Sequence, residues 1–171
     1  PLILLCHAGP HGALSWRHQL PLVAYAGATL LAPYQRGYGN SANPKDVEFY
    51  GVEHLGNDLL ALIDDDGQDQ AILVGHDWGA LITWDLARMH PERLKAVVGV
   101  SVPLVQWPAP PTDLFKMLYT DRFFYMLYFQ PVGPAETELE TDVRDSMAKF
   151  LCNGSGGPAR KLRSRTMAPG S

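Results

Sequence analysis

The chain has 171 residues and a formal net charge of −4, and 46% of its residues are hydrophobic. This length and apolar content suffice for one buried core, and the weakly acidic balance offers no basic face to a nucleic acid or an anionic membrane. Two cysteines are too few for a disulfide framework. No apolar stretch approaches the roughly 18 residues of a membrane span. We therefore expect a globular protein of the reducing cytoplasm, with neither nucleic-acid nor membrane partners.

Strand-like apolar runs alternate with helical patterns along the chain. Strands are predicted at residues 2–6, 28–32, 71–75 and 96–102. Helices are predicted at residues 52–65, 78–89, 113–129 and 136–150. This alternation is typical of an α/β fold with a mostly parallel sheet.

Prolines separate this core from a second, helical part of the chain. Regular structure is excluded at Val102–Pro103 and across residues 107–111, where prolines cluster. We place the core domain at residues 1–103 and a second domain at 104–171. Residues 153–158 are rich in Gly and Ser, and Arg160, Lys161, Arg163 and Arg165 follow without an acidic residue. We interpret 153–171 as a flexible segment rather than as an anion-binding site.

The segment around Asp77 carries the clearest functional signal. An apolar run leads into Gly75-His76-Asp77-Trp78-Gly79, and a helical pattern follows at once. Glycines at both ends let a strand reverse into a helix without a Cβ clash, so that the central side chain projects over the end of the sheet. Asp and Gly also favour ordinary solvated turns. The flanking strand and helix patterns favour a nucleophile elbow, with Asp where a serine hydrolase carries Ser.

A carboxylate at an elbow implies a particular chemistry. It is ionised at neutral pH and needs no base before it attacks an electrophilic carbon. The product is an alkyl ester, which water must then hydrolyse. That water is normally activated by a His that a second acid holds in place.

Four motifs in order resemble the epoxide hydrolases of the α/β-hydrolase fold, over residues 2 to about 150. They are His7-Ala8-Gly9-Pro10 with Ser15-Trp16-Arg17-His18-Gln19, the run Tyr34-Gln35-Arg36-Gly37-Tyr38-Gly39-Asn40-Ser41, the elbow, and Tyr125-Met126-Leu127-Tyr128-Phe129-Gln130. The resemblance implies an α/β-hydrolase core followed by the start of a helical cap domain. It implies hydrolysis of an epoxide to a vicinal diol through an Asp alkyl-enzyme ester, with epoxide and water as partners and with no cofactor or metal.

The resemblance also implies residue roles. Asp77 would be the nucleophile, the backbone N–H groups of Gly9 and Trp78 the oxyanion hole, and Tyr125 the acid for the epoxide oxygen. Tyr125 lies in an aromatic run that could instead be plain core of a cap helix, but its spacing before the Phe-Gln pair favours it over Tyr128. For His7, hydrogen bonding to the loop backbone is the favoured role. The substrate pocket would be lined by His7, Pro10, Trp107, Tyr128 and Phe129.

The chain departs from the family pattern at several positions. Gly9 stands where the family usually has an aromatic residue, so we expect an opened pocket and a looser oxyanion donor. Tyr34 replaces an Asp, and Met126 stands where a Gln often follows the tyrosine. In this family a second tyrosine, the triad acid and the His base follow the cap, whereas here no His follows His90 and the sequence ends at Ser171. We expect an incomplete chain that carries the ester-forming half of the reaction.

Two other functions remain open from the sequence. A haloalkane dehalogenase uses the same Asp attack. To bind the departing halide it needs an N–H donor from a Trp next to the nucleophile and another from a polar residue directly after the His-Gly of the first loop. Trp78 meets the first requirement, but position 9 is Gly and not Asn or Glu. The motif Arg36-Gly37-Tyr38-Gly39 and Tyr125 favour the epoxide instead. A non-catalytic protein that binds a small molecule in a hydrolase pocket is favoured by the missing base.

Overall fold

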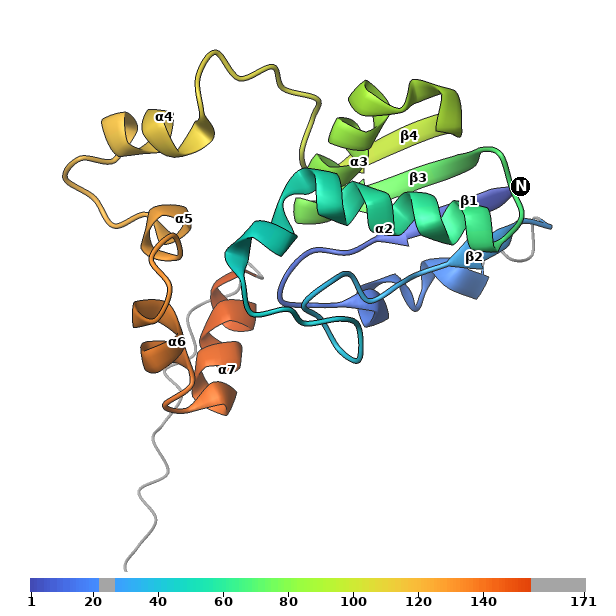
Figure 1. Cartoon of the computed structure of the whole chain (residues 1–171). Helices are drawn as coiled ribbons and strands as arrows, with labels where there is room; N and C mark the ends of the chain where they lie inside the picture. Colours follow the sequence, from blue (N-terminus) through green and yellow to red (C-terminus); the bar gives the residue numbers. More distant parts are fainter. Residues whose placement is uncertain (22–26, 155–171) are drawn as a thin grey trace, which may run out of the picture. The chain divides into compact units, whose positions relative to one another are not determined.

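A computed structural model of the chain describes residues 1–21 and 27–154 (Figure 1). The chain divides into two compact units, Pro1–Gln106 and Trp107–Ser171, and each is described by itself. Most of the stretch expected to be flexible, including the basic residues from Arg160 to Arg165, lies outside the described residues. Its first two positions, 153 and 154, belong to the last helix.

The first unit is built on a parallel sheet of four strands (Figure 1). Its strands are β1 (Leu2–Cys6), β2 (Thr29–Leu31), β3 (Ala71–His76) and β4 (Leu94–Val100), in the order β2-β1-β3-β4. Helix α2 (Val52–Asp65) connects β2 to β3, and α3 (Trp78–Met89) connects β3 to β4. Because the strands are parallel, their carboxyl ends meet at one edge, where Cys6 of β1 pairs with Gly75 of β3. The predicted α/β fold with a parallel sheet is confirmed.

The predicted boundaries in this unit are right for β1, α2 and α3 and differ for the other strands. Strand β2 keeps only three residues. Strand β4 begins two residues earlier than predicted, directly after the 3-10 turn Pro91–Arg93, and ends at Val100. It ends there because Ser101 has φ 70°, a left-handed conformation that cannot continue a strand.

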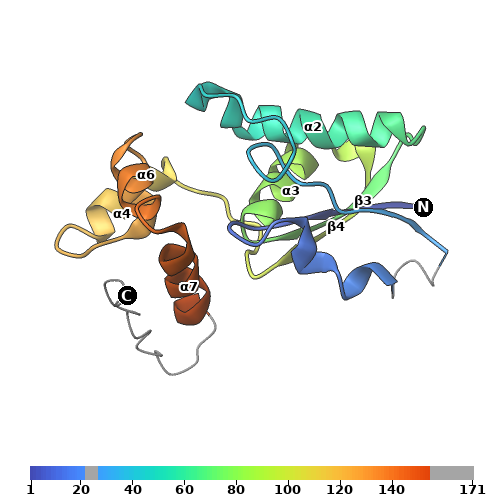
Figure 2. The same cartoon turned by 90° about the horizontal axis from the view of Figure 1, so that it is seen from below.

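The core lies between the sheet and one face of α2 and α3, which Figure 2 shows on the same side of the strands. Leu59 and Ile63 of α2 and Ile82 and Leu86 of α3 are buried against side chains of β1 and β3. Strand β1 is buried almost throughout, as expected for an inner strand of a parallel sheet. This packing fixes the carboxyl ends of β1 and β3, where the candidate site lies.

The second unit is helical, but both of its predicted helices are wrong in extent. The helix predicted at 113–129 is two helices, α4 (Pro111–Leu118) and α5 (Tyr125–Tyr128). Tyr119 leaves the helical conformation at ψ 41°, and the stacked rings of Tyr119 and Phe124, with centroids 4.1 Å apart, close the turn between them. The hydrophobic pattern of the sequence continues across this break, because Tyr119 and Phe124 are aromatic residues that pack within the turn.

The helix predicted at 136–150 is likewise two helices, α6 (Pro134–Leu139) and α7 (Val143–Gly154). Helix α6 begins at a capping box in which the Glu136 carboxylate accepts the Gly133 N–H. The Asp142 side chain accepts the Asp145 N–H at 3.0 Å and so caps the start of α7. Among the described residues, no helix combines the length and apolarity needed to cross a membrane.

Candidate active site

Asp77 lies at the turn between β3 and α3 with φ 54° and ψ −116°. Residues other than glycine are seldom found at these backbone angles, and such backbone strain is concentrated at functional sites. The Asp77 N–H donates to the Val100 carbonyl of β4 at 3.2 Å, and the Asp77 carbonyl accepts the Ala80 and Leu81 N–H groups of α3. The side chain is half-buried. The local geometry is therefore that of a strand-turn-helix elbow with a carboxylate at its apex.

The two glycines that flank Asp77 are required by close backbone packing. A Cβ atom on Gly75 would lie 2.4 Å from the Gly79 carbonyl oxygen. A Cβ atom on Gly79 would lie 2.2 Å from the Cys6 carbonyl oxygen and 2.9 Å from that of His7. The first turn of α3 thus packs directly on the end of β1. The elbow and the loop that follows β1 are neighbours for this reason.

His7, the first residue of that loop, is fully buried and has both ring nitrogens engaged. Its Nε2 atom accepts the Gln35 N–H at 3.0 Å, so Nδ1 carries the proton and donates to the Ala8 carbonyl at 2.9 Å. The Gln35 side-chain amide donates to the His7 carbonyl. Burial lowers the pKa of His7, although the hydrogen bond to Ala8 works against that shift. A neutral imidazole held in this way organises the loop backbone and has no nitrogen left for proton transfer.

Two backbone N–H groups, one in the loop after β1 and one at the start of α3, are candidate donors at the elbow. Gly9 lies two residues after His7, before a cis peptide bond to an exposed Pro10, and Trp78 is the first residue of α3. Within residues 1–21 and 27–154, neither the Gly9 N–H nor the Trp78 N–H donates to a protein acceptor. The first N–H groups of a helix lack an intrahelical partner, which leaves them available to an anion. The Trp78 side chain is 49% exposed.

Tyr38 occupies the space beside Gly9. A Cβ atom on Gly9 would lie 2.4 Å from the Tyr38 Oη atom, so the Tyr38 hydroxyl crowds the place where a longer side chain would begin. That Gly9 opens the pocket or loosens the oxyanion donor stays a prediction. The Tyr38 ring meets the His7 ring edge to face, with centroids 4.7 Å apart. Burial, and secondarily the negative charge of Asp77, raise the pKa of Tyr38. One sequence signal is consistent with Tyr38 lying here: position 9 is glycine where the family usually has an aromatic residue.

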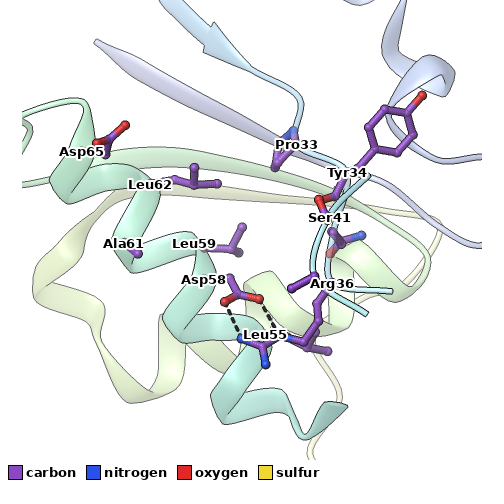
Figure 3. A pocket seen from close by; sticks show the side chains of 12 residues that line it. Pro33, Tyr34, Arg36, Ser41, Leu55, Asp58, Leu59, Ala61, Leu62 and Asp65 are labelled. Carbon is purple, nitrogen blue, oxygen red and sulfur yellow. Dashed lines mark hydrogen bonds and ion pairs between the residues drawn. The ribbon is translucent and has the colours of Figure 1, made fainter. Parts of the chain in front are cut away.

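The loop that carries Tyr38 is fixed to α2 by an ion pair (Figure 3). Arg36 donates to both oxygens of Asp58, from Nε at 2.9 Å and from Nη2 at 2.7 Å. Together with the bonds between Gln35 and His7, this pair anchors the loop although Tyr34 replaces the family's Asp. A cavity of about 470 Å³ lies between the loop and α2, and none of the predicted site residues lines it.

The remaining predicted site residues lie in the second unit. Tyr125 begins α5, is 42% exposed, and its ring lies 5.9 Å from that of Phe129. Tyr128 donates its hydroxyl to the Glu138 carboxylate, which raises the pKa of Tyr128. Trp107 is exposed and packs edge to face on Phe115. The Tyr128 hydroxyl therefore makes a contact within the second unit that sequence spacing alone could not show.

Over the described part of the chain, no three His, Cys, Asp or Glu side chains are grouped as a metal ion would need. In the first unit, the groups that could react or bind are the Asp77 carboxylate, the backbone N–H groups of Gly9 and Trp78, and the Tyr38 phenol. Such a set can form an ester with an electrophilic carbon and stabilise the oxyanion of its cleavage.

Comparison with known proteins places the chain in a family. The sequence profile of the α/β hydrolase fold matches residues 1–132. Epoxide hydrolase A of Mycobacterium tuberculosis is 42% identical over 171 residues, which span 99% of this chain and 53% of that protein. An epoxide hydrolase of Caballeronia sordidicola is 46% identical over 157 residues, which span 91% of this chain and 47% of that protein. The crystal structure of epoxide hydrolase A from Mycobacterium thermoresistibile aligns with a TM-score of 0.85 at 45% identity, covering 88% of this chain and 48% of that one.

The chain therefore belongs to the α/β-hydrolase fold family. It is similar in sequence and structure to proteins named epoxide hydrolases, as the four motifs predicted. It spans about half the length of these relatives.

Proposed function

We propose that this protein hydrolyses epoxides to vicinal diols through an ester on Asp77. The observation that carries the proposal is the strained Asp77 at the β3–α3 elbow, close to the loop after β1 and the start of α3. Each of these presents a backbone N–H, of Gly9 and of Trp78, that has no protein acceptor among the described residues. The similarity to named epoxide hydrolases supports the same chemistry. The substrate class is an epoxide, and the second reactant is water.

In the first step, an Asp77 oxygen attacks an epoxide carbon and the carbon–oxygen bond of the ring breaks. The electron pair of that bond moves to the epoxide oxygen, and the Tyr125 phenol gives it a proton. An alkoxide is a poor leaving group in water, so a phenol that gives up its proton as negative charge develops on the epoxide oxygen lowers the barrier. The products of this step are an alkyl ester on Asp77 and a tyrosinate.

In the second step, water adds to the ester carbonyl and a tetrahedral oxyanion forms. The N–H groups of Gly9 and Trp78 would stabilise this charge, which exists only after the attack. When the intermediate collapses, the bond between the carbonyl carbon and the substrate oxygen breaks. The base that took a proton from water gives it to that oxygen, and the Asp77 carboxylic acid gives its proton to the Tyr125 tyrosinate. The diol is released, and the Asp77 carboxylate and the Tyr125 phenol are restored. The step needs a base to activate water, and His7 is unsuited to that role because both of its nitrogens are held by the loop.

Peptide mass spectrometry after incubation with styrene oxide tests the proposal. We expect a covalent adduct on Asp77, because ester formation needs only groups that the chain contains. Cys6 will not compete, since burial raises the pKa of its thiol to about 12. Adducts on Cys152 are separated by the peptide assignment. An unlabelled Asp77, with native structure verified by circular dichroism, would contradict the mechanism.

Replacing Tyr125 by Phe is expected to slow the labelling of Asp77 by about 100-fold, within the range of general acid catalysis. Tyr128→Phe is the matched control, because the Tyr128 hydroxyl is bound to Glu138. The rate of adduct formation, followed by intact-mass spectrometry, is the measurement. An equal loss in both variants would show that the aromatic packing of the cap matters and that Tyr125 is not the acid.

A further inference from the structure

The most distinctive feature of this site is the pairing of Gly9 with Tyr38. The Tyr38 Oη atom lies 2.4 Å from the point where any larger residue at position 9 would place its Cβ atom. It therefore lies close to the Gly9 backbone, which carries one donor of the proposed oxyanion hole. The charge of Asp77 acts on the same hydroxyl, which shows that the two groups are within electrostatic range of each other.

Several contacts hold Tyr38 in this position. Its ring packs on the buried His7 ring, and His7 is fixed at both nitrogens. The Tyr38 N–H donates to the Gln35 carbonyl at 2.9 Å, and the Tyr38 carbonyl accepts the Ser41 N–H at 3.1 Å. The Arg36–Asp58 pair ties the same loop to α2. A donor that is placed before the reaction needs no reorganisation when charge appears, which is the condition for effective oxyanion stabilisation.

The Tyr38 hydroxyl is also available as a donor. Within the described residues it makes no hydrogen bond to a protein acceptor, whereas the Tyr50 and Tyr128 hydroxyls donate to Asn43 and Glu138. The raised pKa of Tyr38 keeps the phenol protonated at neutral pH. An oxyanion donor must carry its proton, and the neutral Tyr38 phenol does.

We propose that the Tyr38 hydroxyl is a third donor to the oxyanion that forms when the ester on Asp77 is cleaved. The inference rests on the function proposed above. A nucleophile adds to the ester carbonyl carbon, and the π electrons of the carbonyl move to its oxygen. Tyr38 donates a hydrogen bond to that oxygen and keeps its proton. When the intermediate collapses, the alcohol leaves with a proton from solvent.

Hydroxylamine provides a test that needs no base from the protein. The chain is first labelled with styrene oxide, and hydroxylamine is then added. Its nitrogen attacks the ester carbonyl through the same oxyanion and leaves a hydroxamate on Asp77, which peptide mass spectrometry detects. We expect Tyr38→Phe to slow hydroxamate formation at least about tenfold, because it removes one oxyanion donor. Labelling by styrene oxide, which forms no tetrahedral intermediate, should change less than about twofold.

Two further variants separate this role from a structural one. Tyr34→Phe removes a phenol from the same loop, and we expect both rates to stay at the wild-type level. Gly9→Ala places a Cβ atom against the Tyr38 hydroxyl and should displace it, so it should slow hydroxamate formation as Tyr38→Phe does. In the double variant Gly9→Ala with Tyr38→Phe, the second change should add little, because there is no longer a hydroxyl to displace.

The outcomes are distinguishable. If wild-type Asp77 is never labelled, the proposed function fails and the role of Tyr38 fails with it. If Asp77 is labelled and Tyr38→Phe reacts with hydroxylamine at the wild-type rate, the inference about Tyr38 is wrong and the proposed function stands. Equal slowing of labelling and of hydroxamate formation would also overturn it, since that result indicates a general loss of site structure.

Discussion

Replacing Asp77 by Asn is expected to abolish adduct formation with styrene oxide, a loss of at least about 10⁴-fold as found for other essential nucleophiles. The amide of Asn is no substitute for the carboxylate nucleophile. Asn is the informative replacement because its side chain has nearly the size and shape of the Asp77 side chain and lacks only the charge and one carboxylate oxygen. Asp77→Ala should lose the same activity, but it also removes most of the side-chain volume.

The matched control is Asp85→Ala, which removes another carboxylate of the same helix, one that pairs with Arg88 near the surface. We expect normal labelling of Asp77 in this variant. The measurement is peptide mass spectrometry over a time course, with circular dichroism to verify folding. In any longer form of the protein that completes the reaction, oxygen from labelled water should enter Asp77 in a single turnover. If that longer form still produced diol with Asp77→Asn, the ester mechanism would be wrong.

Substituting Ala for Gly79 should have the largest effect on folding. The new Cβ atom would lie 2.2 Å from the Cys6 carbonyl oxygen, and the contact is with backbone that cannot rotate away. Helix α3 would have to separate from β1, which carries part of the core. We expect a destabilisation of at least about 3 kcal/mol, the upper end of overpacking effects, or loss of soluble protein.

Gly51→Ala is the control for that substitution. A Cβ atom there meets its first neighbour, the Glu48 carbonyl oxygen, at 3.6 Å, and Gly51 has the ordinary φ of −61°. We expect a change in the free energy of unfolding within about 1 kcal/mol, as is usual for surface and helix-cap positions. Urea unfolding followed by circular dichroism measures both variants. Equal stability of Gly79→Ala and wild type would contradict the close packing of the elbow.

The elements that the sequence predicted well are those set by local pattern. Strand β1 and helices α2 and α3 have the predicted bounds. An inner strand that is buried on both faces is a continuous apolar run, and burial of one helix face imposes a period of 3.6 on adjacent residues. The elbow could be recognised for the same reason, since its glycines and Asp77 are consecutive. In the second unit the pattern failed, because aromatic residues such as Tyr119 and Phe124 pack within a turn that periodicity does not register.

By itself, the sequence determined the α/β class, the elbow with Asp77 at its apex and the likeness to epoxide hydrolases, all of which depend on neighbouring residues. Only the tertiary structure decided how distant residues meet. It placed the Tyr38 hydroxyl where a side chain at position 9 would begin, and it bound His7 to Gln35, 28 residues away. Such contacts arise when parallel strands bring successive loops to one edge of the sheet, and no local pattern encodes which atoms then touch. The surroundings of Gly9 are one such case, because a residue from another loop crowds the place where a side chain at position 9 would begin.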